Sequence, residues 1–336
     1  MRTRISYTVS RVSDALNGVV AFTRQASAFN PFGFHKKGAQ TKAVFALGIV
    51  CFFWGTTWIA SKEGVRHMPA LQMAGIRQSI AGIFYVLFFV IKKASFPKQK
   101  EWWPILVLSI LNFMLSNGLS TWGVKYISAG LGSIIGSIFP LWLVIIGYVG
   151  SKSPLNKKTV LGLVLGFSGI CVIFYGHLQD FLEAEFRFGI LLSLVSTWSW
   201  AFGTLYTKQH ALTFNPYFAL GLQMLISGPV LYGISVITHN YVPVPAIPWQ
   251  SWAAIGYLVV FGSVIAFAAY LYALQILPTE QASIYAYLNP VVAFLAGAIL
   301  FGEKITAAIV AGILITLAGV YQVNKSVRDN ADTLEE

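Results

Sequence analysis

The chain has 336 residues, of which 56% are hydrophobic and 10% are charged, and its formal net charge is +11. Soluble globular chains are about one quarter charged, so this composition excludes an ordinary soluble domain and indicates a chain that folds in lipid. The positive charge does not indicate a nucleic-acid partner, because the basic residues lie mainly in short gaps between apolar runs and not on one folded surface.

Residues 1–42 form a basic segment in which Asp14 is the one acidic residue. We expect a cytoplasmic tail without packed structure. The same composition is typical of an organelle transit peptide, and a start codon assigned too early gives the same pattern, so these three interpretations stay open. The segment has no apolar stretch, which excludes a secretory signal.

Ten apolar runs follow, each close to the length of about 20 residues that a membrane-spanning helix needs. Each must be helical, because lipid offers no hydrogen-bond partners to an open backbone. The predicted spans are 43–61, 70–91, 104–123, 127–150, 159–176, 188–208, 216–238, 251–276, 280–301 and 306–323, with a cytoplasmic tail at 324–336. The sequence therefore predicts an all-α membrane protein with ten transmembrane helices.

The Lys and Arg residues in the gaps predict the orientation, because short cytoplasmic loops carry an excess of both. With the N-terminus inside, 17 of them fall in the inner segments and 5 in the outer gaps, while Arg77 lies within a span. We therefore expect both termini in the cytoplasm and the chain in the cell (inner) membrane.

The two halves of the chain repeat one pattern. A shift of 150 residues aligns 117–171 with 267–321 without a gap, and a shift of 146 aligns Trp54 with Trp200 and Arg77 with Gln223. The first shift also pairs Ser133 with Ser283, Pro140 with Pro290, Gly147 with Gly297, Gly162 with Gly312 and Gly169 with Gly319. Each half has five spans, an odd number, so the halves at 43–176 and 188–323 are predicted to form two inverted five-helix repeats, as in many secondary transporters.

The order of several short motifs resembles the EamA-type transporters of the drug/metabolite transporter superfamily. The motifs are 54–56 (Trp-Gly-Thr), Arg77, 289–290 (Asn-Pro) and 302–303 (Gly-Glu), and the resemblance covers about 43–323. One departure is that the first half has Lys-Ser-Pro at 152–154 where the second has Gly-Glu-Lys at 302–304. The resemblance implies a transporter of amino acids, metabolites or drugs, with no single substrate. We expect no cofactor and no catalysed reaction.

Aromatic and polar residues inside the spans are the candidates for binding or gating. An aromatic-walled cavity with hydroxyl and amide groups suits amphipathic organic solutes. The candidates are Trp54, Arg77, Asn117, Trp122, Ser133, Trp200, Gln223, Tyr272, Tyr285 and Asn289. Structural interpretations stay open beside these roles: Arg77 as a snorkelling side chain, the aromatic residues as an interfacial belt, and the polar residues as contacts between helices.

The acidic residues bear on energy coupling. None lies in the middle of a predicted span, and Glu280 at the start of the ninth span is the one acid that we consider for coupling. Intramembrane proton relays use buried carboxylates or His, so the sequence favours exchange or facilitated movement over proton-coupled antiport. No spacing of His, Cys, Asp and Glu indicates a metal site.

Together these features predict a multi-pass transporter that moves small organic solutes by alternating access, as an exporter or exchanger. The alternatives are a sugar-phosphate or nucleotide-sugar exchanger and a channel-like facilitator. The expected partners are a small-molecule substrate and the lipid bilayer, with no nucleic acid, and pairing as a homodimer is left open. A membrane-embedded enzyme is not favoured, because it needs buried paired acids or metal ligands.

Overall fold

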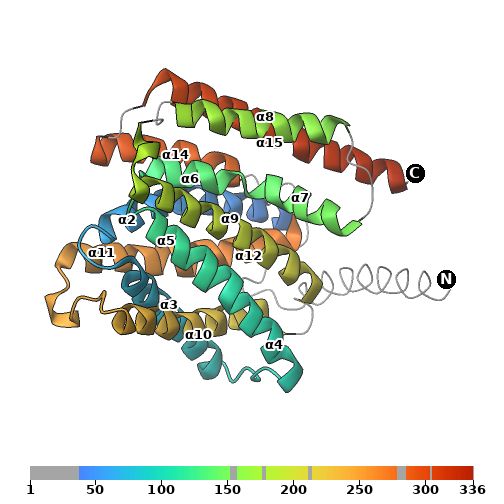
Figure 1. The fold of residues 1–336 in the computed structure, drawn as a ribbon. Coiled ribbons are helices and arrows are strands. Elements are labelled where there is room, and N and C mark those ends of the chain that lie inside the picture. The colour runs from blue at the N-terminus through green and yellow to red at the C-terminus, as the bar shows by residue number, and fades with distance from the viewer. Residues whose placement is uncertain are drawn as a thin grey trace.

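The computed structural model describes residues 38–151, 157–175, 179–210, 214–277, 285–302 and 305–335. Within these ranges the elements are helices and turns, and no β-strand is present. The long helices lie side by side in a bundle (Figure 1). Six helical runs in the described ranges are long and apolar enough to cross a membrane: Ala39–Gly64, Ala70–Ile91, Gln99–Gly123, Ala184–Thr207, Pro216–Ile237 and Trp249–Ile276. Shorter apolar helices cover Ala129–Leu143, Leu288–Leu300 and Ala307–Val323.

The first half of the bundle consists of α2 (Ala39–Gly64), α3 (Ala70–Ile91), α4 (Gln99–Leu108), the π-helix η2 (Ser109–Gly118), α5 (Leu119–Gly123), α6 (Ala129–Ser137), α7 (Phe139–Ser151) and α8 (Lys157–Tyr175). The second half consists of α9 (Ala184–His210), α10 (Pro216–Ile237), α11 (Trp249–Tyr257), the π-helix η5 (Leu258–Ile265), α12 (Ala266–Ile276), α14 (Tyr285–Phe301) and α15 (Ala307–Glu335). The short 3-10 helices η3 (Asp180–Leu182) and η4 (Val244–Ala246) lie in connections.

The helices follow the predicted spans with three differences. The predicted helix over 127–150 is two helices, α6 and α7, which meet at Ile138. Pro140 explains the break, because a proline has no N–H for the carbonyl four residues earlier and its ring clashes there. The third span begins at Gln99, before the predicted start, and the tenth continues as helix to Glu335.

Two π-helices lie in the middle of the third and eighth spans, and the sequence pattern did not predict them. The segments are η2 at Ser109–Gly118 and η5 at Leu258–Ile265. The shift of 150 residues places η5 opposite 108–115, so the two segments occupy equivalent places in the two halves. A π-turn inserts a residue into the helical ladder and is frequent at functional sites.

Helices α8 and α15 pack along each other through glycines. A Cβ on Gly162 would lie 2.8 Å from the carbonyl oxygen of Gly319, and a Cβ on Gly312 would lie 2.6 Å from that of Gly169. The early glycine of each helix therefore meets the late glycine of the other, so the helices run antiparallel. Small residues at such positions let two membrane helices approach closely.

Helices α3 and α10 repeat this arrangement at the other edge of the bundle. A Cβ on Gly75 would lie 2.8 Å from the carbonyl oxygen of Gly228, and a Cβ on Gly82 would lie 3.0 Å from that of Gly221. The shift of 146 residues pairs Gly75 with Gly221 and Gly82 with Gly228. Each pair of equivalent helices thus meets through reciprocal glycine contacts.

The outward faces of the helices are apolar and the inward faces carry many hydroxyl groups. Phe45, Ile91 and Ile299 are 72%, 69% and 80% exposed, as lipid-facing side chains are. Buried hydroxyl residues instead gather in the interior, among them Ser116, Ser133, Ser137, Ser196 and Thr197. This distribution places the polar chemistry of the protein at the centre of the bundle.

Candidate solute-binding cavity

A cavity lies at the centre of the bundle and is lined by both halves of the chain. We call it cavity 1; it encloses about 870 Å³, including the part that is open to solvent. Nine of its lining residues are Ser or Thr: Thr57, Ser61, Ser116, Ser120, Thr121, Ser133, Ser137, Ser196 and Thr197. Arg77, Asn117 and Asn289 add charged and amide groups. Hydroxyl, amide and aromatic groups gathered around one cavity suit a small organic molecule.

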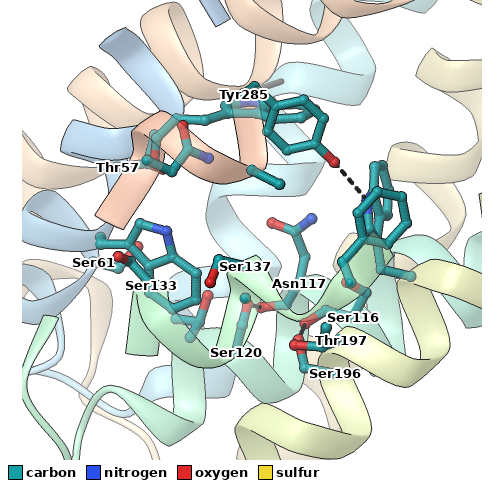
Figure 2. A pocket seen from close by; sticks show the side chains of 18 of the residues that line it. Thr57, Ser61, Ser116, Asn117, Ser120, Ser133, Ser137, Ser196, Thr197 and Tyr285 are labelled. Carbon is teal, nitrogen blue, oxygen red and sulfur yellow. Dashed lines mark hydrogen bonds between the residues drawn. The ribbon is translucent and has the colours of Figure 1, made fainter. Parts of the chain in front are cut away.

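The lining residues follow from helical periodicity, because side chains four positions apart share one face of a helix. Thr57 and Ser61 are such a pair on α2, Ser133 and Ser137 on α6, and Ser196 and Trp200 on α9. Figure 2 shows that the first two pairs and Ser196 face one space, into which Asn117 projects, and Trp200 lines the same cavity. Each helix therefore contributes one short polar stripe, and the stripes meet at the cavity.

Most of the cavity hydroxyls donate to backbone carbonyls. Ser120 donates to Asn117 O at 3.1 Å, Ser137 to Ile134 O at 2.7 Å, and Ser196 to Ser116 O at 2.8 Å. Their oxygens can still accept a hydrogen bond from a solute. Ser133 differs, because its buried hydroxyl has no partner among the described residues. Its hydroxyl hydrogen is therefore not committed to a backbone carbonyl.

Arg77 brings a positive charge into the bundle. The residue is 6% exposed, and its Nε donates to Ser263 Oγ at 3.0 Å. The described acidic residues make no ion pair with it. A buried charge without a counter-charge is costly in a membrane interior, so an anionic group in cavity 1 would find a strong electrostatic partner.

Beside cavity 1 lies a cluster of five rings that we call the aromatic partition, and four of them, all but Tyr270, line the cavity. Its members are Trp54, Trp200, Phe267, Tyr270 and Tyr285. The Trp54 ring lies 4.9 Å from that of Tyr285, 5.0 Å from those of Phe267 and Tyr270, and 6.1 Å from that of Trp200.

Hydrogen bonds fix the two indoles of the aromatic partition. Trp200 Nε1 donates to the Tyr285 hydroxyl at 3.1 Å, the bond drawn in Figure 2, and Trp54 Nε1 donates to Gly262 O at 3.2 Å. Gly262 lies in the π-helix η5, so the backbone of that segment holds Trp54 in place.

Asn289 connects α14 to α2. Oriented by its surroundings, its side-chain amide nitrogen donates to the carbonyl oxygens of Tyr285 and Cys51, each at 3.0 Å. Pro290 follows within the helix and has no N–H to donate. The role of Asn289 in this geometry is to hold the helix that carries Tyr285 against α2 at the wall of the cavity.

A second cavity lies beyond the aromatic partition, and we call it cavity 2. It encloses about 790 Å³, including its open part, and its lining residues include Glu101, Asn112, Ala219, Gln223 and Leu274. Trp200 and Phe267 line both cavities, so they form part of the wall between them. The run 99–123 shows how the cavities are separated: its start borders cavity 2 and its end borders cavity 1.

The structure brings seven of the predicted site residues together at cavity 1: Trp54, Arg77, Asn117, Ser133, Trp200, Tyr285 and Asn289. Gln223 lines cavity 2 instead. Trp122 packs its ring 5.3 Å from that of Phe188, and neither Trp122 nor the buried Tyr272 lines either cavity. Glu280 lies outside the described residues.

Several hydroxyl residues that line cavity 1 were not among the site residues predicted from the sequence. They are Thr57, Ser61, Ser116, Ser120, Thr121, Ser196 and Thr197. The signal that finds them is the spacing of four residues between polar positions in otherwise apolar spans. Among the described residues, no group of three His, Cys, Asp or Glu is placed to hold a metal ion.

Several membrane-spanning helices around an internal polar cavity define a multi-pass membrane transporter, and comparison with known proteins agrees. Residues 41–175 and 187–325 each match the EamA-like transporter family. The chain therefore belongs to the EamA-like transporter family, within the drug/metabolite transporter superfamily, whose members are transporters and not enzymes.

Two relatives illustrate the similarity. The chain is 32% identical over 267 residues to the uncharacterized inner membrane transporter YedA of Escherichia coli K12, covering 79% of this chain and 83% of the relative. It is 29% identical over 296 residues to the uncharacterized transporter YvbV of Bacillus subtilis, covering 86% and 93%. A solved crystal structure shares the fold with a TM-score of 0.62 at 14% identity, covering 84% of this chain and 97% of the other.

Proposed function

We propose that this protein moves small organic solutes, such as amino acids, metabolites or drugs, across the membrane by alternating access, as an exporter or exchanger. The observation that carries the proposal is cavity 1 itself. Both halves of the chain supply its walls, with hydroxyl and amide groups on most sides and the aromatic partition on one. A site between two halves that rock against each other is exposed first to one face of the membrane and then to the other.

The proposal treats 43–176 and 188–323 as two inverted five-helix repeats. Its support is the antiparallel packing of equivalent helices: α8 lies against α15 and α3 against α10 through reciprocal glycine contacts. Two nearly equivalent halves give two conformations of similar energy. That balance is what alternating access needs.

We place the chain in the cell (inner) membrane with both termini in the cytoplasm. The connection between α3 and α4, the start of α8 and the end of α15 lie at one end of the bundle, on the right in Figure 1. The excess of Lys and Arg falls in these segments. In this orientation cavity 2 faces the cytoplasm and cavity 1 faces outward.

Two alternatives are less well supported. A sugar-phosphate or nucleotide-sugar exchanger needs several cations around phosphate, whereas Arg77 is the one Lys or Arg among the lining residues of cavity 1. A channel-like facilitator needs a continuous path, whereas the aromatic partition stands between the cavities. We also propose that transport follows the solute gradient, with Glu280 as the one candidate for ion coupling.

Counterflow with the purified protein in liposomes tests the proposal. Vesicles are loaded with unlabelled amino acids, nucleosides or cationic dyes, and uptake of the labelled compound is followed. We expect saturable uptake for one class, loss of it in Trp54→Ala, and no change in the lipid-facing control Phe45→Ala. Flux that rises linearly with concentration and ignores internal solute would contradict alternating access.

A further inference from the structure

We infer that cavity 2 is a second solute site, the repeat-related counterpart of cavity 1, which takes uncharged solutes with an apolar body and one N–H or O–H donor. Carboxylate groups bind in cavity 1 and not in cavity 2. This inference rests on the proposed function only for the route by which a solute passes between the two cavities.

The repeat relates the two cavities residue by residue. The shift of 146 residues aligns four lining residues of cavity 1 with four lining residues of cavity 2. The aligned pairs are Trp54 with Trp200, Trp58 with Thr204, Ser61 with Thr207 and Arg77 with Gln223. The shift of 150 residues takes Asn117, Ser120 and Thr121 to Phe267, Tyr270 and Leu271, which also line cavity 2. Cavity 2 is therefore formed in part by the residues of one repeat that are equivalent to the cavity 1 residues of the other repeat.

The chemistry of the two cavities differs at the equivalent positions. Cavity 2 has Gln223 where cavity 1 has the buried Arg77, and its described lining residues include no Lys or Arg. It also has phenyl, phenol and isobutyl side chains where cavity 1 has an amide and two hydroxyls. Cavity 2 therefore favours an apolar body and offers a carboxylate no counter-charge from the equivalent of Arg77.

Gln223 supplies the polar contact that gives cavity 2 its specificity. The residue is 5% exposed and lines cavity 2. Its amide oxygen can accept a hydrogen bond from a solute N–H or O–H. The other lining amide, Asn112, turns its Oδ1 against α9, because a Cβ on Gly203 would lie 1.9 Å from that oxygen.

Protection of cysteines from a small thiosulfonate reagent tests the inference without any transport step. The full chain is purified in nanodiscs, with Cys51 and Cys171 replaced by Ala, and carries either Ala219→Cys in cavity 2 or Ser120→Cys in cavity 1. The probes are phenylacetamide, which is neutral and has N–H donors, and phenylacetate, its anionic near-isostere. We expect phenylacetamide to slow labelling at position 219, and phenylacetate to slow labelling at position 120 only.

Exchanging the two repeat-related residues gives the sharper result. In the double variant Arg77→Gln with Gln223→Arg, protection by phenylacetate should move from position 120 to position 219, with a change of roughly tenfold or more in the protecting concentration, as a charged hydrogen bond provides. Gln223→Leu should weaken phenylacetamide protection at position 219. Size-exclusion profiles identify variants that do not fold, and the single variant still decides the outcome if the exchange variant is lost.

Two results would overturn the inference: phenylacetate protecting position 219 of the unexchanged chain as well as phenylacetamide does, or neither probe protecting that position. The outcome is separable from the proposed function. Counterflow without protection in cavity 2 contradicts this inference alone, whereas protection without counterflow contradicts the transport proposal alone.

Discussion

Gly319→Ala is the perturbation whose effect the structure sets most directly. A Cβ at this position would lie 2.2 Å from the backbone nitrogen of Gly166, 2.6 Å from its Cα and 2.7 Å from the carbonyl oxygen of Gly162. All three atoms belong to the backbone of α8, so no side-chain rotation relieves the clash. Non-bonded carbon atoms pack at about 3.5–4.0 Å, so α8 and α15 must separate by about 1 Å or more.

The cost follows from overpacking, which destabilises well-packed sites by about 1–3 kcal/mol. We expect the upper end, about 3 kcal/mol in the free energy of unfolding, because the separation also loosens the neighbouring contacts between Gly162 and Val323. Gly48→Ala is the matched control, since a Cβ there meets nothing within 4 Å. The helix propensity of Ala makes that change neutral or stabilising by up to about 1 kcal/mol.

The assay is unfolding of the purified chain in mixed micelles by titration with a denaturing detergent, followed by tryptophan fluorescence and repeated for Gly319→Ala and Gly48→Ala. Gly169→Ala should resemble Gly319→Ala, because its Cβ would lie 2.4 Å from the backbone nitrogen of Thr316. If Gly319→Ala unfolds at the same detergent fraction as Gly48→Ala, the close antiparallel packing of α8 and α15 is refuted.

Three further predictions concern the site and the topology. Trp200→Phe and Tyr285→Phe each remove the bond between the indole and the hydroxyl, so the double variant should change counterflow no more than either single variant; additive effects would show that the bond has no role. Ser133→Ala should leave stability unchanged or slightly raised, while solute affinity falls by about 1 kcal/mol, roughly fivefold; equal affinity would place the solute away from this hydroxyl. In a chain without native cysteines, Asn330→Cys should react with an impermeant reagent only from the cytoplasmic side, and reaction from outside in intact cells would reverse the assigned orientation.

The sequence predicted the helical architecture well, because spans in lipid are selected by a simple rule of length and hydrophobicity. It did not predict the π-helices at Ser109–Gly118 and Leu258–Ile265 or the break at Ile138. An added residue in a helical turn leaves almost no trace in hydropathy. Pro140 did mark the break, but prolines also stand inside unbroken helices, as Pro229 and Pro290 do.

The site was predicted in part. Residues that stand out by type, such as Arg77 and Trp54, were found because an isolated charge or paired indoles are rare in apolar spans. Trp122 was predicted but lines neither cavity. The repeat aligns it with Tyr272, and such an alignment shows that two positions are equivalent, not that their side chains face the interior. Ser120 and its neighbours were missed, because a single hydroxyl inside a membrane helix most often contacts its own backbone, and only the meeting of several helices shows that these hydroxyls share a space.

The measurement that tests alternating access most directly compares two repeat-related positions, Ser61 in cavity 1 and Thr207 in cavity 2. Each is replaced by Cys in a chain without native cysteines, and labelling rates are measured in membrane vesicles with and without a saturating gradient of a transported solute. We expect reciprocal changes: a gradient that raises the labelling rate of Ser61→Cys lowers that of Thr207→Cys, and reversing the gradient reverses both. Rates that rise together, or that do not respond to the solute, would contradict alternating access.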